Sequence, residues 1–260
     1  MYKIFCIDIG NTRTHCACVA CRDGAFEVSC AGDFPSADFA DILRTRHLFE
    51  TSDASGISWC SVVPKYSEAL ADAFKHISAP IVGLSHKNSP MPLDILRPEQ
   101  LGQDRIADAV GAGVFLTPPY LVVDMGTAVT IDLVDARGHY AGGAIAPGMS
   151  AFVDYLASRT AQLPAINPAD ADCTLSIGKD TVQAMSVGCA KGFCKLVDGL
   201  IADIERDFFG GESAFRKTVF TGGSVDYLPR EWLGDRLVNR DLAYIGLAKS
   251  FIFNKTETEL

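Results

Sequence analysis

Two stretches of the chain share the pattern that decides the fold. Residues 4–19 read IFCIDIGNTRTHCACV, and residues 120–134 read YLVVDMGTAVTIDLV. Each is an apolar strand, then Asp-x-Gly with a threonine close behind, then a second apolar strand, which predicts a hairpin whose tight turn carries an acid and a glycine. Such an echo indicates an internal duplication. We therefore expect two copies of one α/β unit, as domains over residues 1–116 and 117–260 with a cleft between them.

Strands and helices alternate along the whole chain. Runs rich in Val and Ile, bounded by Gly, Pro, Asn or Asp, predict strands over 3–9, 14–20, 57–63, 80–84, 119–125, 128–134 and 217–221. Apolar residues at helical spacing predict helices over 37–48, 65–77, 103–115, 148–158, 182–207 and 241–253. Alternation of this kind predicts an α/β fold.

Composition and charge narrow the class of protein. Of the 260 residues, 48% are hydrophobic and 21% are charged, which is typical of a folded globular protein and excludes intrinsic disorder and a fibrous architecture. The 23 basic residues are outnumbered by 32 acidic ones, so the formal net charge is −9. Because a negative field opposes binding to phosphate backbones, we expect no nucleic acid partner.

The apolar runs are too short for a membrane protein. A transmembrane helix needs about 18 consecutive apolar residues, and Asp8, Asp124 and Asp132 interrupt the best candidates. The segment 3–9 is also too short for the apolar core of a signal peptide. We expect no membrane partner and a cytoplasmic location, where the nine cysteines would be thiols rather than disulfides.

One group of cysteines raises the alternative of a zinc site. His15, Cys16, Cys18 and Cys21 could begin one, but no second pair of ligands follows at zinc-finger spacing. In a strand over 14–20, Cys16 and Cys18 point to one face as small buried side chains, and we favour that interpretation.

The turn after the first strand has the composition of a phosphate-binding loop. Gly10 permits a close backbone approach that a side chain would block, and Asn11, Thr12 and Thr14 offer donors to phosphate oxygens. Asp8 can hold a hydrated Mg²⁺ that neutralises those phosphates. For a single motif, an ordinary hairpin turn is an equal alternative.

Further glycine-rich segments favour the nucleotide interpretation. Residues 124–130 repeat the acid, the glycine and the threonines of the first turn. GGAIAPG at 142–148 precedes a predicted helix, and TGGS at 221–224 follows a predicted strand. Either could be plain turn chemistry, but each could also bring backbone N–H groups close to a ligand. Together these segments resemble the acetate kinase, sugar kinase, Hsp70 and actin superfamily, which implies two duplicated actin-like (ribonuclease H-like) α/β domains with a nucleotide cleft between them.

More specific motifs narrow the resemblance to one family. They are SVVP at 61–64, LGQDR at 101–105, GGAIAPG at 142–148 and GKDT at 178–181, which is followed by Ala184 and Gly188. In this order, from residue 4 to about residue 250, they resemble type III pantothenate kinase. The resemblance implies ATP-dependent phosphorylation of pantothenate to 4′-phosphopantothenate, the first step of coenzyme A biosynthesis.

The resemblance also implies roles for individual residues. The ATP contacts would be Asp8, Ile9, Gly10, Asn11, Thr12, Arg13, Thr14, His15 and Thr127. The pantothenate contacts would be Gly102, Gln103, Asp104, Arg105 and Thr181, with Asp104 as the catalytic proton acceptor. Asp124 would hold a monovalent cation, K⁺ or NH₄⁺, and Asp8 would hold Mg²⁺ through water. Taken without the resemblance, Asp104 and Arg105 read as a helix N-terminal acid and a solvated arginine.

The chain departs from the family pattern at one edge of the substrate pocket. Members often carry a tyrosine some residues before the Gly-x-Asp-Arg segment, but PLDILRP at 92–98 has none. Two alternatives remain at this point. One is another small-molecule kinase of the same superfamily, and the other is a nucleotide-binding regulator without turnover.

The resemblance further implies a homodimer with the substrate site near its interface. The predicted helix 182–207 carries an apolar stripe that must be buried. We expect most of this stripe to pack on its own sheet. The dimer face would then come from the flanking residues and from the helix at 148–158, through an isologous contact.

Overall fold

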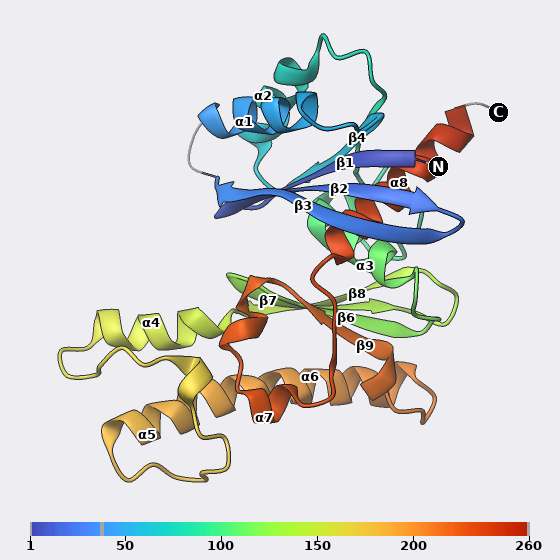
Figure 1. Ribbon diagram of the computed structural model, residues 1–260. Helices are drawn as coiled ribbons and strands as arrows, with labels where there is room; N and C mark the ends of the chain where they lie inside the picture. Colours follow the sequence, from blue (N-terminus) through green and yellow to red (C-terminus); the bar gives the residue numbers. More distant parts are fainter. Residues whose placement is uncertain (1, 37–38, 259–260) are drawn as a thin grey trace. The chain divides into compact units, whose positions relative to one another are not determined.

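The structure, a computed structural model, describes residues 2–36 and 39–258. Internal contacts divide the chain into two units. The first contains the described residues of Met1–Phe115 and Asp241–Leu260, and the second contains Leu116–Arg240. Each unit has one five-stranded sheet with helices packed against it (Figure 1).

The first sheet combines an antiparallel meander with two parallel strands. Its strands are β1 (Tyr2–Ile9), β2 (Arg13–Arg22), β3 (Ala25–Pro35), β4 (Gly56–Ser61) and β5 (Ile81–Gly83). They lie in the order β3-β2-β1-β4-β5, with β1 to β3 antiparallel and β4 and β5 parallel to β1. Parallel pairs need crossover connections, and α1 (Phe39–Glu50) and α2 (Pro64–Phe74) lie within them.

The second sheet repeats this arrangement. Its strands are β6 (Tyr120–Met125), β7 (Ala128–Val134), β8 (Tyr140–Pro147), β9 (Thr218–Thr221) and β10 (Leu237–Val238). Their order is β10-β9-β6-β7-β8, with β6 to β8 antiparallel and β9 and β10 parallel to β6. With β6 in the place of β1, order and direction are the same in both sheets. The predicted duplicated α/β fold is therefore confirmed.

Helices cover both faces of the first sheet. Phe5, Ile7 and Ile9 of β1 pack in a core with α1 and α2, whereas Ile4 and Cys6 pack in a second core with α3 (Gln103–Ala112) and α8 (Leu242–Thr258). Because successive strand residues alternate between faces, Asp8 follows Cys6 on the face covered by α3 and α8. Figure 1 shows α8, in red, beside α3 on that side of the blue sheet.

The last helix belongs to the first unit, although the predicted second domain extends to residue 260. Two glycines let α8 lie directly on α3. A Cβ at Gly111 would lie 2.1 Å from the Leu242 carbonyl oxygen, and a Cβ at Gly246 would lie 1.8 Å from the Ala107 carbonyl oxygen. Periodicity predicts this helix, but it cannot say which sheet the helix covers.

The helices of the second unit are α4 (Met149–Arg159), α5 (Thr181–Met185), α6 (Gly192–Phe208) and the short α7 (Arg230–Leu233). Residues of α4, α6 and α7 pack in one core with β6, β7 and β9. A π-helical turn, Ser186–Lys191, joins α5 to α6, so the predicted helix over 182–207 is confirmed with this distortion inside it. Phe193, Leu196 and Leu200 of its stripe pack in one core with β6 and β7, as expected.

Three strands were not among the predicted elements. β3 is mostly exposed, and β8 contains the glycine pair of GGAIAPG, so both lack the apolar pattern of a typical strand. β10 has only two residues. These strands form because β2, β7 and β9 offer them unpaired edges.

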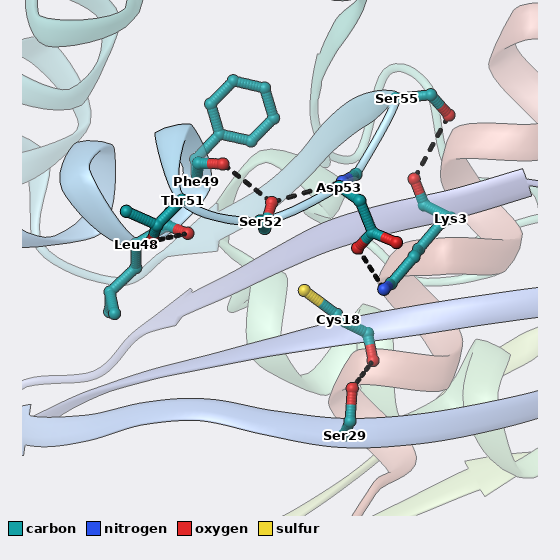
Figure 2. A network of polar contacts seen from close by, with 10 residues as sticks. Lys3, Cys18, Ser29, Leu48, Phe49, Thr51, Ser52, Asp53 and Ser55 are labelled. Carbon is teal, nitrogen blue, oxygen red and sulfur yellow. Dashed lines mark hydrogen bonds and ion pairs between the residues drawn. The ribbon is translucent and has the colours of Figure 1, made fainter.

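Short polar contacts hold the connection from α1 to β4 against β1 (Figure 2). The Ser52 hydroxyl donates to the Phe49 carbonyl oxygen at 2.7 Å, and the Ser55 hydroxyl donates to the Lys3 carbonyl oxygen at 3.2 Å. Lys3 also forms an ion pair with Asp53. These contacts lie where the parallel pairing of β1 and β4 begins, and they help to keep the register that places Cys60 opposite Asp8.

The cysteines are thiols, and most are buried. Cys16 and Cys18 lie on β2 and share one core with α1 and α2, as predicted for a strand, whereas Cys21 lies in the other core. Among the helices that the structure describes, none has the length and apolar character needed to cross a bilayer.

Candidate functional site

Asp8 occupies the carboxyl-terminal end of β1, between two strands. Its neighbours in register are His15 on β2 and Cys60 on β4. The Cys60 thiol donates to Asp8 Oδ1 at 3.3 Å. Burial raises the pKa of Asp8, against the smaller opposing effects of this hydrogen bond and of His15. The carboxylate thus lies where charge is costly, and a bound cation would stabilise it.

Cys60 links Asp8 to the start of α3. Burial, followed by the negative charges of Asp8, Asp104 and Asp108, raises the pKa of the Cys60 thiol well above its usual value. The thiol therefore stays protonated and can act as a donor. The Ser61 N–H, one residue further on, donates to Gln103 Oε1 at 3.0 Å, so the end of β4 lies near the start of α3 as well as near Asp8. Sequence reasoning missed Cys60. Two signals could have found it, because it directly precedes SVVP and lies at a position of the predicted strand that alternation places on a buried face.

The first predicted phosphate loop is a three-residue turn between β1 and β2. The Gly10 N–H donates to the Arg13 carbonyl oxygen at 2.9 Å, which closes the turn and leaves Asn11 and Thr12 exposed. Arg13 and His15 are paired with Asp33, at 2.7 and 3.2 Å.

Two other residues of that loop, Ile9 and Thr14, are buried and form hydrogen bonds within the first unit. Thr14 is buried, with its hydroxyl 2.8 Å from the Ser36 hydroxyl. Ile9 is 1% exposed, and its carbonyl accepts the Val62 N–H at 3.1 Å. The exposed tip at Asn11 and Thr12 is thus the part of the loop that the structure offers most openly to a ligand.

The Gly-Gln-Asp-Arg segment forms the amino-terminal turn of α3. Asp104 folds back over Gly102, because its Oδ1 accepts the Arg105 N–H at 2.8 Å. A Cβ on residue 102 would lie 2.4 Å from that oxygen, so the glycine makes room for the carboxylate. Gln103 Oε1 accepts the Ser61 N–H at 3.0 Å. Asp108, one turn further along, is 6% exposed and was not among the predicted site residues.

Three glycine-rich segments converge in the second unit. Asp124 is in register with Thr130 on β7 and with Thr221 on β9. Gly222, with φ of 91°, passes so close that a Cβ would lie 2.3 Å from Asp124 Oδ1. The missing side chain leaves a cradle against this carboxylate, and hard oxygen donors of this kind suit a cation.

The third segment packs on the turn itself. A Cβ at Gly148 would lie 2.3 Å from the Gly126 carbonyl oxygen, and the Gly148 N–H donates to the Thr127 carbonyl oxygen at 3.0 Å. The Thr127 side chain is exposed. The turn at 124–130, GGAIAPG and TGGS therefore form one local structure, which their separate positions in the sequence do not reveal.

Thr181 lies at the edge of an apolar cavity in the second unit. It is the first residue of α5, and Asp180 caps that helix by accepting the Gln183 N–H at 2.8 Å. The cavity has a volume of about 760 Å³ and is lined by Pro147, Ala151, Phe152, Tyr155, Leu156, Leu163, Thr181, Ala184, Met185, Gly188 and Cys189. Tyr155 and Val182, next to it, are 62% and 51% exposed. The structure thus places Thr181 on an unusually apolar exposed surface.

Comparisons with known proteins agree with these motifs. A family model described as type III pantothenate kinase matches residues 4–203. A type III pantothenate kinase of Akkermansia muciniphila is 40% identical over 173 residues, which is 66% of this chain and 67% of that protein. A type III pantothenate kinase of Desulfotalea psychrophila is 32% identical over 86% of this chain and 88% of its own length.

Solved structures support the fold. A Campylobacter jejuni protein described as a Baf family transcriptional activator has a TM-score of 0.63 at 21% identity, with coverage of 97% of this chain and 99% of that one. The ADPNP-bound activator of 2-hydroxyisocaproyl-CoA dehydratase from Clostridium difficile has a TM-score of 0.52 at 12% identity, with coverage of 99% and 98%. At these identities the likeness concerns the fold alone. The family model and the curated relatives decide the activity: this chain belongs to the type III pantothenate kinase family, and it uses ATP to phosphorylate pantothenate to 4′-phosphopantothenate, the first step of coenzyme A biosynthesis.

Proposed function

We propose that Asp104 is the general base of this kinase and that Asp8 serves the ATP phosphates. The observation that carries the proposal is the end of β4, where the Cys60 thiol donates to Asp8 and the N–H of the next residue, Ser61, donates to Gln103, which directly precedes Asp104. The ends of β1 and β4 and the start of α3 therefore bring two carboxylates to one side of the first unit. A kinase needs both functions, one at the phosphates and one at the acceptor hydroxyl.

Asp104 would orient the pantothenate hydroxyl and accept its proton as the phosphoryl group is transferred. Its Oδ1 is held by the Arg105 N–H, which limits rotation of the carboxylate. The segment Gly102–Arg105 and Thr181 would bind pantothenate. The Arg105 guanidinium could pair with the substrate carboxylate or with the transferring phosphoryl group.

The residues at the first turn suit ATP and Mg²⁺. The loop from Asp8 to His15 would bind the phosphates, with Thr127 as a further ATP contact. Asp8 is a hard oxygen donor at a costly, half-buried position, which fits a hydrated Mg²⁺. When bound, this ion would neutralise phosphate charge. Asp124, in the cradle that Gly222 leaves, would hold K⁺ or NH₄⁺.

A homodimer and a cytoplasmic location belong to the same proposal. The apolar cavity beside Thr181, with exposed Tyr155 and Val182 around it, is a surface that a second copy of the chain would cover. An isologous contact there would place α4 and α5 at the interface. Light scattering at micromolar concentration should give twice the chain mass, and Tyr155→Asp should lower it. A monomeric mass with full specific activity would contradict a required dimer.

The role of Asp104 is tested with Asp104→Asn, and exposed Asp72 on α2 offers the matched control, Asp72→Asn. We expect the Asp104 variant to lose turnover, by about 100-fold or more, while its ATP affinity changes little. The control should keep both. Turnover near that of the wild type in the Asp104 variant would remove this residue from the mechanism.

A further inference from the structure

Among the residues that the structure describes, no neighbouring strand offers an acceptor to the Ser61 N–H group. Along β4, Ile57 donates to the Pro80 carbonyl oxygen on the β5 side, and Val62 donates to the Ile9 carbonyl oxygen on the β1 side. Since strand N–H groups alternate between sides, the Ser61 N–H points toward the β5 side. β5 ends at Gly83, before it reaches this position. Ser61 is 6% exposed, so water is a poor substitute.

Gln103 supplies the missing acceptor. Its Oε1 lies 3.0 Å from the Ser61 nitrogen. A backbone N–H is a donor, so only the oxygen of the side-chain amide can serve here. Gln103 is also the first residue of α3, where the N–H groups of the first turn have no intrahelical acceptor, so a side-chain bond to a strand adds an anchor at this end of the helix. A side chain of the helix thus replaces the carbonyl of a neighbouring strand.

The hydrogen bond between Gln103 and Ser61 lies between the two carboxylates that are proposed to act in the reaction. Asp104 follows Gln103 directly, and Cys60, which donates to Asp8 at 3.3 Å, precedes Ser61 directly. The last two residues of β4 therefore contact both parts of the site. The Cys60 thiol donates to Asp8, and the Ser61 N–H donates to the side-chain amide of the residue before Asp104. A shift of the first turn of α3 relative to β4 would change the distance between the general base and the phosphate site.

We propose that Gln103 is a positioning residue that holds Asp104 in place by anchoring the start of α3 to the end of β4. The proposal rests on the role of Asp104 proposed above. Although Gln103 lies in the segment proposed to bind pantothenate, its side-chain oxygen is used by the Ser61 N–H. We therefore expect the side chain to act on the placement of the base rather than on affinity for pantothenate.

Three variants test this role. Gln103→Met keeps the length of the side chain and removes the acceptor, whereas Gln103→Glu keeps an oxygen at the same position. Gln100→Met is the matched control, because Gln100 is exposed three residues earlier. Since small misplacements of a catalytic group cost up to about 100-fold, we expect Gln103→Met to lower kcat by about 10- to 100-fold with little change in either KM.

A second readout follows the bond itself. In Gln103→Met, the Ser61 amide should exchange with deuterium faster than in the wild type, as measured by NMR or by mass spectrometry of peptides ending near it. Gln103→Glu should restore most of kcat and of the protection, and Gln100→Met should match the wild type in every measurement. ATP affinity and Tm report whether each variant is folded.

Several outcomes would overturn the proposal. An unchanged kcat in a folded Gln103→Met would do so, as would a raised KM for pantothenate with kcat intact, which would make Gln103 a substrate contact. If Gln103→Met fails to fold, a folded Gln103→Glu that has lost most of its kcat would be equally decisive. Failure of the proposed base is seen separately, as an active Asp104→Asn, and leaves the exchange result at Ser61 readable.

Discussion

The two Asp-x-Gly turns are copies in topology, but their surroundings differ. Asp8 on β1 and Asp124 on β6 occupy equivalent places in two sheets of the same strand order. Asp8 lies between His15 and Cys60, and a thiol donates to it. Asp124 lies between two threonines, and the backbone of Gly222 closes on its carboxylate.

This difference shows how duplication separates two tasks. Both copies keep the acid, since a strand end next to a tight turn is a natural place to present a carboxylate with open N–H groups. In the first copy, the following parallel strand, β4, carries a donor and is hydrogen-bonded at its end to the helix of the proposed base. In the second copy, it carries a glycine pair that lets backbone approach. We propose that the first acid serves Mg²⁺ and phosphates and the second a monovalent cation.

The largest effect should come from Asp8→Asn. Asn keeps the size and an acceptor for Cys60 but cannot neutralise a cation, so we expect turnover to fall at least about 100-fold. Stability should behave in the opposite way. A raised pKa means that the charged carboxylate destabilises the fold, and this cost is complete once the pH exceeds the folded-state pKa.

At pH 7, Asp8→Asn should therefore have a Tm equal to or above that of the wild type, and the difference should shrink as the pH falls toward the unfolded pKa of about 3.9. Thermal unfolding between pH 4 and 7 checks the sign. A lower Tm at pH 7 would mean that the carboxylate stabilises the fold.

The next effect should be at the second acid. In the wild type, rates at fixed ionic strength should be higher in K⁺ or NH₄⁺ than in Na⁺. Asp124→Asn should remove this difference without removing all turnover, because the residue is proposed to act through a cation other than Mg²⁺. Exposed Asp203→Asn on α6 is the control and should keep the wild-type ratio. Equal rates in all three salts for the wild type would disprove the assignment.

A smaller effect should come from the glycine that closes on Asp124. Gly222→Ala would place a Cβ 2.3 Å from the carboxylate, at a φ of 91°. We expect it to lower the free energy of unfolding by about 1–3 kcal/mol and to weaken the response to K⁺. Gly223→Ala is the neighbour control, because its Cβ would meet nothing within 4 Å. Similar losses in both variants would show that close approach at Gly222 has no special role.

The smallest effect should come from the thiol that sets the first copy apart. Cys60→Ser keeps a donor to Asp8, and we expect kcat to stay within about threefold of the wild type. Cys60→Val keeps the volume but loses the donor, and should raise the Mg²⁺ concentration needed for half-maximal rate. Magnesium titrations of both variants make the comparison. If Cys60→Val titrates like the wild type, the thiol is only a packing residue.

Much of this protein could be predicted from local sequence. Strand and helix periodicity predicted the main elements, since each pattern follows from the geometry of one element. The echo between residues 4–19 and 120–134 predicted the duplication, and the motifs SVVP, LGQDR, GGAIAPG and GKDT, in this order, predicted the family. Gly102 was predicted as part of a motif, and its reason is also local, because it makes room for a carboxylate two residues away.

Only the tertiary structure decided the contacts between segments that are distant in sequence. That α8 covers the first sheet, that Cys60 donates to Asp8, and that Gln103 replaces a strand carbonyl at Ser61 all depend on packing and register. The same is true of the meeting of Gly222 with Asp124. A sequence pattern predicts which face of a strand or helix a residue occupies. Its partner on that face depends on the packing of the whole unit and on which polar groups remain unpaired, and a single segment does not contain that information.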